Sequence, residues 1–126
     1  MSTLRVQRGD AVSLFVRTDG RRGTALPLVC VAGLNRNSRD FDAVAARWGA
    51  ERFVVRPDLR GRGHSSYDPT GATYTIEHAV DDVVAVLDAL GLARVVLLGS
   101  SMGGLVSMQL VRDHPERVAG IALNDV

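Results

Sequence analysis

Residues 95–104 read VVLLGSSMGG, and this stretch decides the fold. Its four leading apolar residues are typical of a strand that is buried on both faces of a parallel sheet. A helical pattern follows at once, so the chain must turn from strand to helix within about two residues. Such a turn forces its central residue, Ser101, into a strained backbone conformation and needs small neighbours. Gly99 and Gly103 meet that need.

Outside this stretch, short apolar runs predict strands, and apolar residues at three- and four-residue intervals predict helices. The strands are expected at residues 5–7 and 12–16, which form a hairpin, and at 28–31, 52–56 and 121–124. The helices are expected from Ser38, as the cap, to Trp48, and from Thr75, as the cap, to Leu90 before Gly91. This alternation predicts an α/β fold with a mainly parallel sheet and helices on both faces.

Composition predicts one domain and excludes two classes of partner. The chain has 126 residues, of which 46% are hydrophobic, enough for one packed core. Fifteen Lys and Arg against fourteen Asp and Glu leave a net charge of +1, so we expect neither nucleic acid nor a membrane surface as partner. The start lacks a signal-peptide pattern, and no run approaches the roughly 20 apolar residues of a membrane span. We therefore expect a soluble, cytoplasmic protein, in which Cys30 is a core residue.

The stretch from Gly99 to Gly103 also carries the chemistry, because it fits the pattern Gly-x-Ser-x-Gly between a strand and a helix. The turn lifts the Ser101 hydroxyl above the sheet edge, and the helix directs its positive end at the same place. An alternative is a structural or phosphate-binding loop, but Ser101 occupies the second glycine position of a dinucleotide fingerprint, and the lysine of a P-loop is absent. Ser101 has a glycine two positions away on each side, whereas Ser100 does not. Ser101 is therefore the predicted nucleophile.

Two further motifs come before this one in the chain: VAGLNRNSRDF at residues 31–41 and PDLRGRGHS at residues 57–65. In this order, the three motifs resemble the N-terminal part of the α/β-hydrolase superfamily, over essentially the whole chain. The resemblance implies a serine hydrolase that cleaves a carboxylic ester, lactone or related small acyl substrate through an acyl-enzyme on Ser101, without cofactor or metal. The alternatives are an acyltransferase or C–C bond hydrolase on the same fold, or a non-catalytic remnant or binding protein.

The resemblance also assigns the other parts of the site. The backbone N–H groups of Leu34 and Met102 would form the oxyanion hole. Ala32 stands where the family usually has His, so we expect the loop to be held differently. The cap, the triad His and the C-terminal strands are missing, which makes residues 1–126 the N-terminal part of a single domain. Asp125, after the last expected strand, is a candidate for the triad acid.

Arg60, Arg62 and His64 lie in the second motif, which braces the rim of the site in the family. A functional interpretation makes the two arginines an anion clamp, and a structural one, which we favour, makes them loop braces and solvated charge. His64 lies too early in the chain for the triad His, so we expect it to support the loop or to lie on the surface.

The remaining polar candidates have structural interpretations. Asp81 and Asp82 lie near the start of a predicted helix, where negative charge is stabilised, and we expect both to be solvated. His78 and His114 lack the spacing of metal ligands, so no metal site is predicted.

Overall fold

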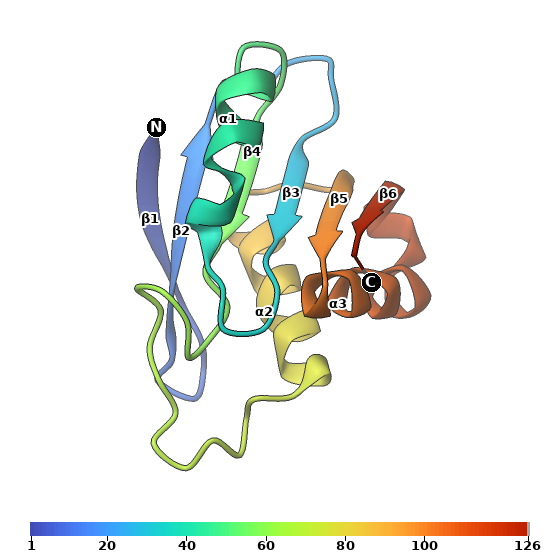
Figure 1. Ribbon diagram of the computed structural model, residues 1–126. Coiled ribbons are helices and arrows are strands. Elements are labelled where there is room, and N and C mark those ends of the chain that lie inside the picture. Colours follow the sequence, from blue (N-terminus) through green and yellow to red (C-terminus); the bar gives the residue numbers. More distant parts are fainter. Residues whose placement is uncertain (126) are drawn as a thin grey trace.

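The computed structural model describes residues 1–125, which form one six-stranded sheet with helices on both faces (Figure 1). The strands are β1 (Ser2–Gln7), β2 (Ser13–Asp19), β3 (Leu28–Val31), β4 (Val54–Pro57), β5 (Val95–Ser100) and β6 (Val118–Asn124). The α-helices are α1 (Asp42–Trp48), α2 (Ile76–Ala89) and α3 (Met102–Asp113), and the short 3₁₀ helices are η1 (Ser38–Phe41) and η2 (Pro115–Arg117).

The strand order is β1-β2-β4-β3-β5-β6. The N-terminal hairpin of β1 and β2 adds antiparallel strands to one side, and β4, β3, β5 and β6 are all parallel. This confirms the predicted mainly parallel α/β sheet. Because Val31 is paired with Gly99, the ends of β3 and β5 lie side by side at one edge of the sheet. The functional motifs therefore meet at the edge where the parallel strands end.

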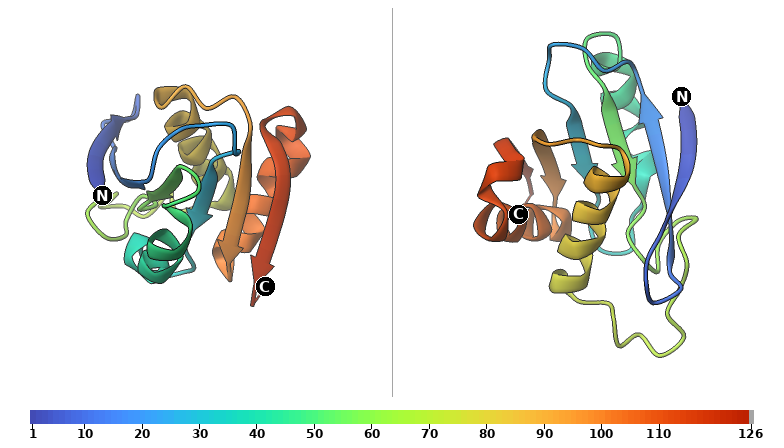
Figure 2. Two further views of the ribbon diagram at one scale, coloured as in Figure 1. Left: turned by 90° about the horizontal axis from the view of Figure 1, so that it is seen from above. Right: turned by 180° about the vertical axis from the view of Figure 1, so that it is seen from behind.

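The helices divide between the two faces, as Figures 1 and 2 show, with α1 on one face and α2 and α3 on the other. The larger core joins the apolar sides of α2 and α3 to the sheet, whereas the smaller one joins Phe41 and Ala45 to β3 and β4. Cys30 is fully buried in the smaller core, as expected. Beside α1, an apolar groove of about 340 Å³ extends across β5 to β6. None of the helices in residues 1–125 is long and apolar enough to cross a membrane.

The helix starts show one confirmed cap and one wrong prediction. The Thr75 side chain accepts a hydrogen bond from the His78 N–H and caps α2, as predicted. The predicted Ser38 cap is wrong, because the side chain of Asn37 caps η1 and α1 begins only at Asp42. Ser38 is fully buried, and its hydroxyl accepts a hydrogen bond from Arg17 instead. The last strand is also longer than predicted, since it begins at Val118.

A buried ion network connects the second motif to α2. Arg60 donates from Nε and Nη2 to both carboxylate oxygens of Asp82, at 2.7 and 2.8 Å, and from Nη1 to Asp10 at 2.8 Å. Arg8 adds a 2.9 Å bond to Asp82. These hydrogen bonds raise the pKa of Arg60, and the bond with Asp82 is the largest cause. The expectation that Asp82 is solvated is therefore wrong, although Asp81 is exposed, and Arg60 is confirmed as a brace.

We predict that Asp82→Ala lowers the free energy of unfolding by about 3 kcal/mol, because it leaves the buried Arg60 guanidinium without its bidentate partner. The matched control is Asp81→Ala, which removes an exposed carboxylate from the preceding residue and should change stability by less than about 0.5 kcal/mol. Urea unfolding of both variants measures the difference, and equal losses would contradict the assigned role of Asp82.

Candidate functional site

Ser101 lies at the junction of β5 and α3, with φ of 53° and ψ of −120°. A positive φ is uncommon for a residue with a side chain, and strain of this kind costs about 1–3 kcal/mol. The chain thus passes from strand to helix through one residue. The strained strand-to-helix turn predicted from the sequence is confirmed at this position.

Glycines on both sides of Ser101 make the turn sterically possible. A Cβ atom on Gly103 would lie 2.0 Å from the carbonyl oxygen of Val31, and one on Gly99 would lie 2.5 Å from the carbonyl oxygen of Gly103. Both contacts are with backbone, which cannot move aside as the end of a flexible side chain can. The N-terminus of α3 therefore packs directly against the end of β3, and this contact requires glycine.

Backbone hydrogen bonds hold the strained residue in place. The N–H group of Ser101 donates to the carbonyl oxygen of Asn124 at 3.0 Å, and its carbonyl oxygen accepts from the N–H group of Gly104 at 2.9 Å. The residue is exposed to solvent. Within residues 1–125 its hydroxyl has no hydrogen-bond partner. The turn at Ser101 therefore presents a hydroxyl without a hydrogen-bond partner at the edge where the parallel strands end.

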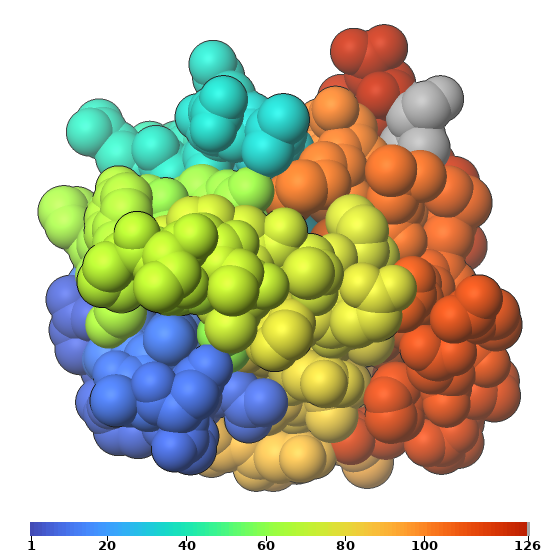
Figure 3. All heavy atoms as spheres, turned by 90° about the horizontal axis from the view of Figure 1, so that it is seen from below, coloured from blue at the N-terminus to red at the C-terminus, as the bar shows by residue number. Residues whose placement is uncertain are grey.

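The loop after β3 lies directly against Ser101. A Cβ on Gly33 would be 3.1 Å from Cβ and 3.6 Å from Oγ of Ser101. Figure 3 views the edge where the parallel strands end, and the segment after β3 (cyan) touches the start of α3 (orange) there. Leu34, the next residue, is 58% exposed. This places the predicted oxyanion loop on the same side of the sheet as the nucleophile.

Two backbone donors beside Ser101 are unused. Among the described residues, the N–H groups of Leu34 and Met102 donate no hydrogen bond. Met102 begins α3, where the first N–H groups of a helix have no partner within the helix and carry a partial positive charge. Both N–H groups are therefore unpaired among the described residues, and their use as an oxyanion hole stays a prediction.

Asp58 holds the loop after β3 against the loop after β4. Its buried carboxylate accepts from the N–H groups of Ser38 at 2.7 Å and His64 at 2.9 Å. A Cβ on Gly63, where φ is 52°, would lie 2.2 Å from this carboxylate. The Ser65 hydroxyl donates to the Asp58 carbonyl oxygen at 2.6 Å. The bracing role that the resemblance implied for this motif is confirmed, and it supports a loop that has Ala rather than His at position 32.

The histidines of the chain lie away from the nucleophile. The His64 ring packs edge-on against Phe15, with ring centroids 5.0 Å apart, and His78 bonds to the cap Thr75. His114 follows the 12-residue helix α3, which puts it roughly 20 Å along the axis from Ser101. Within residues 1–125, none of them shares a hydrogen bond with Ser101. In residues 1–125, none of the three histidines is thus a hydrogen-bond partner of the Ser101 hydroxyl.

Asp125 and Cys30 are the remaining candidate groups. Asp125 follows β6 with φ of 53°, next to the Asn124 carbonyl that holds Ser101. Cys30 is not a competing nucleophile, because burial raises the pKa of its thiol to about 12 and keeps it protonated at neutral pH. In the described part of the chain, no three His, Cys, Asp or Glu side chains gather so as to hold a metal ion.

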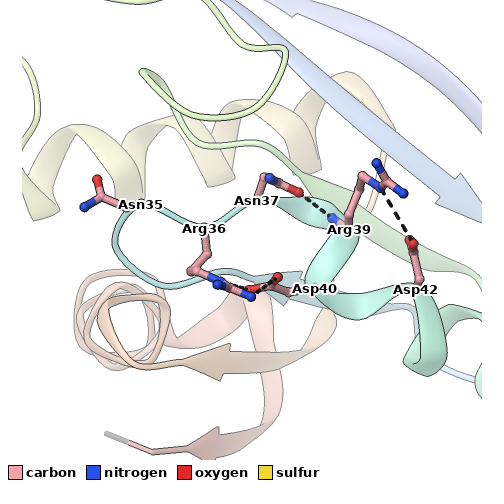
Figure 4. A pocket seen from close by; sticks show the side chains of 6 residues that line it. All are labelled: Asn35, Arg36, Asn37, Arg39, Asp40 and Asp42. Atoms are coloured by element: carbon pink, nitrogen blue, oxygen red, sulfur yellow. Dashed lines mark hydrogen bonds and ion pairs between the residues drawn. The ribbon is translucent and has the colours of Figure 1, made fainter.

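Two polar hollows flank the loop after β3. Figure 4 shows the first, of about 410 Å³, where Arg36 pairs with Asp40 and Arg39 with Asp42. The second, of about 480 Å³, is lined from two loops, by Asn35, Arg36, Asn37, Gly61, Arg62, Gly63 and Tyr67. Neither hollow was predicted from the sequence, and the second could not be, because it depends on how two separate loops meet.

We predict that Gly103→Ala destabilises the protein by at least about 3 kcal/mol, because the new methyl group would overlap the Val31 carbonyl oxygen. The control is Gly120→Ala in β6, where an added Cβ would have no atom within 4 Å and should change stability by less than about 1 kcal/mol. Thermal or urea unfolding measures both changes. Similar stabilities of the two variants would show that close packing of α3 does not impose the turn.

Comparison with known proteins agrees with this geometry. The alpha/beta hydrolase fold family matches residues 27–126. The chain is 39% identical over 99 residues to the 3-hydroxybutyrate-oligomer hydrolase of Cupriavidus necator, covering 79% of this chain and 34% of that protein. A crystal structure of an alpha/beta hydrolase from Novosphingobium aromaticivorans superposes with a TM-score of 0.93 at 36% identity, over 99% of this chain and 44% of that one.

A second solved structure, Est816, is described as an N-acyl homoserine lactone degrading enzyme. It has a TM-score of 0.86 at 34% identity and covers 95% of this chain and 44% of its own. The present chain therefore spans between about a third and a half of the length of these relatives. The family match, the fold and the strained serine turn lead to one conclusion: this chain belongs to the alpha/beta hydrolase family.

Proposed function

We propose that this chain supplies the nucleophile and the oxyanion hole of a serine hydrolase for a carboxylic ester, lactone or related acyl compound. The observation that carries the proposal is the backbone of Ser101, strained at φ 53° and ψ −120° and exposed at the start of α3. Such strain persists where the surrounding structure holds it in place, and it is common at catalytic nucleophiles. The 3-hydroxybutyrate-oligomer hydrolase and the lactone-degrading Est816 support an acyl substrate.

The proposed reaction has two steps. Ser101 Oγ attacks the acyl carbonyl carbon while a base takes its proton, and the resulting oxyanion accepts hydrogen bonds from the N–H groups of Leu34 and Met102. The alcohol leaves with that proton and an acyl-enzyme remains. Water then attacks the acyl-enzyme while the same base takes its proton, and the base passes this proton to Ser101 Oγ as the acid is released. The reaction requires no cofactor.

The base is proposed to come from sequence beyond residue 126, and the orienting acid either from that sequence or from Asp125. A serine hydroxyl needs a base within hydrogen-bond reach, and the three histidines bond or pack elsewhere. The relatives named above are more than twice as long as the region they share with this chain. Asp125 remains a candidate for the acid, because it follows β6 close to the elbow. Efficient Ser101-dependent turnover by residues 1–126 alone would contradict this part of the proposal.

We predict that a fluorophosphonate modifies the full-length protein at Ser101, and that Ser101→Ala abolishes the adduct. Ser100→Ala is the matched control, since it removes the neighbouring hydroxyl, which accepts a 3.4 Å bond from Asn124. This control should still be labelled, at a rate within about threefold of the parent. Peptide mass spectrometry locates the adduct. Labelling that survives Ser101→Ala, or an unlabelled parent protein, would refute the proposed nucleophile.

A further inference from the structure

The second hollow, here called the Arg62 cleft, has an unbalanced charge. Its lining combines the loop that follows Leu34 with the loop after β4, and encloses about 480 Å³. Two of its lining residues, Arg36 and Arg62, are cationic, and none is a carboxylate. Arg36 is already neutralised by Asp40, through bonds of 2.8 and 2.9 Å. The charge of Arg62 is therefore the one that the cleft presents to a ligand.

Arg62 keeps one edge of its guanidinium group free. Its Nη1 donates to the carbonyl oxygen of Arg60 at 2.8 Å, which agrees with the predicted brace. Within residues 1–125, its Nε and Nη2 donate no hydrogen bond, and the side chain forms no ion pair. The Nε–Nη2 edge presents two parallel N–H groups, which is the geometry that binds a carboxylate in a bidentate manner.

Neighbouring residues fix the position of this guanidinium group. It stacks on the Tyr74 ring at 5.4 Å from the centroid, and the Tyr74 hydroxyl accepts a 2.6 Å bond from the Asp68 N–H. Gly61, where φ is 78°, makes room for that ring, since a Cβ there would lie 2.5 Å from Tyr74 Cζ. A side chain that is already ordered loses little conformational entropy when a ligand binds. Arg62 is thus organised before any ligand arrives.

The Asp68 turn that supports Tyr74 is itself tightly bonded. The carboxylate accepts four hydrogen bonds from the N–H and hydroxyl groups of Thr70 and Thr73, between 2.8 and 3.0 Å. These bonds lower the pKa of Asp68, with the Thr73 N–H as the first cause. Its carboxylate oxygens are thus occupied by its own turn, and among the described residues Asp68 forms no ion pair with Arg62.

We propose that the Arg62 cleft binds a carboxylate group carried by the acyl substrate of Ser101, so that the enzyme favours anionic esters over neutral ones. The cleft begins at Asn35, two residues after Gly33, which touches Ser101. A single unpaired cation matches the single charge of a carboxylate. This inference rests on the proposed function, because it names the substrate class of the same nucleophile.

The test compares two esters with the same adipoyl chain on the full-length protein: p-nitrophenyl hydrogen adipate, which is anionic, and p-nitrophenyl methyl adipate, which is neutral. The measured quantity is the ratio of their kcat/KM values. We expect the parent to favour the anion and Arg62→Gln to lower the ratio about tenfold. Arg62→Lys, which keeps the positive charge but not the two parallel N–H groups of the guanidinium edge, should lose part of the preference for the anionic ester. Arg39→Gln, which removes a rim cation outside the cleft, should keep the parent ratio within about twofold.

The outcomes separate this inference from the proposed function. If both esters are turned over and the kcat/KM ratio is the same in the parent and in Arg62→Gln, the carboxylate-binding role of the Arg62 cleft is overturned. The proposed hydrolase function then still stands. If neither ester is cleaved, the proposed function fails. A ¹H–¹⁵N titration with monomethyl adipate then decides, without any turnover, whether the Arg62 cleft binds a carboxylate. A shift of the Arg62 Nε–H resonance that dimethyl adipate does not produce supports the inference, and an unchanged resonance overturns it.

Discussion

The contact between the N-terminus of α3 and the end of β3 is the constraint on which the site depends. Because Gly103 has no Cβ, the helix comes so close that an added methyl would lie 2.0 Å from the Val31 carbonyl oxygen. The chain must then leave β5 through a single strained residue, Ser101. Hydrogen bonds with Asn124 and Gly104 offset part of the strain. The exposed Ser101 hydroxyl therefore lies beside the positive N-terminal end of α3 and the unpaired Met102 N–H because of one packing contact.

Buried charges give the rim of the site its shape. The Asp58 carboxylate bonds to Ser38 and His64, from two different loops, and Asp82 joins Arg60 to α2. Each acid fixes the relative position of segments that apolar contacts would leave free to slide, because hydrogen bonds are directional. With the rim held in this way, the Arg62 cleft lies open between the same two loops.

Much of the fold was predictable because its signals are local. The apolar run of β5 and the two glycines predict the turn at Ser101, and Thr75 predicts the start of α2. The wrong predictions concern residues whose partners are distant in sequence. Ser38 has the chemistry of a cap, but a contact with Arg17 buries it. Near a helix start Asp82 looks solvated, yet its partners are 22 and 74 residues away. Helical periodicity alone carries no information about such pairs.

The most direct test of the central claim is a crystal structure of the full-length protein with an organophosphonate bound to Ser101, since the phosphoryl oxygen then stands in for the oxyanion of the tetrahedral intermediate. The account predicts this oxygen within about 2.7–3.1 Å of the backbone nitrogens of both Leu34 and Met102. A phosphoryl oxygen directed away from both N–H groups, with the loop after β3 in its present position, would contradict the claim that this packing builds a hydrolytic site.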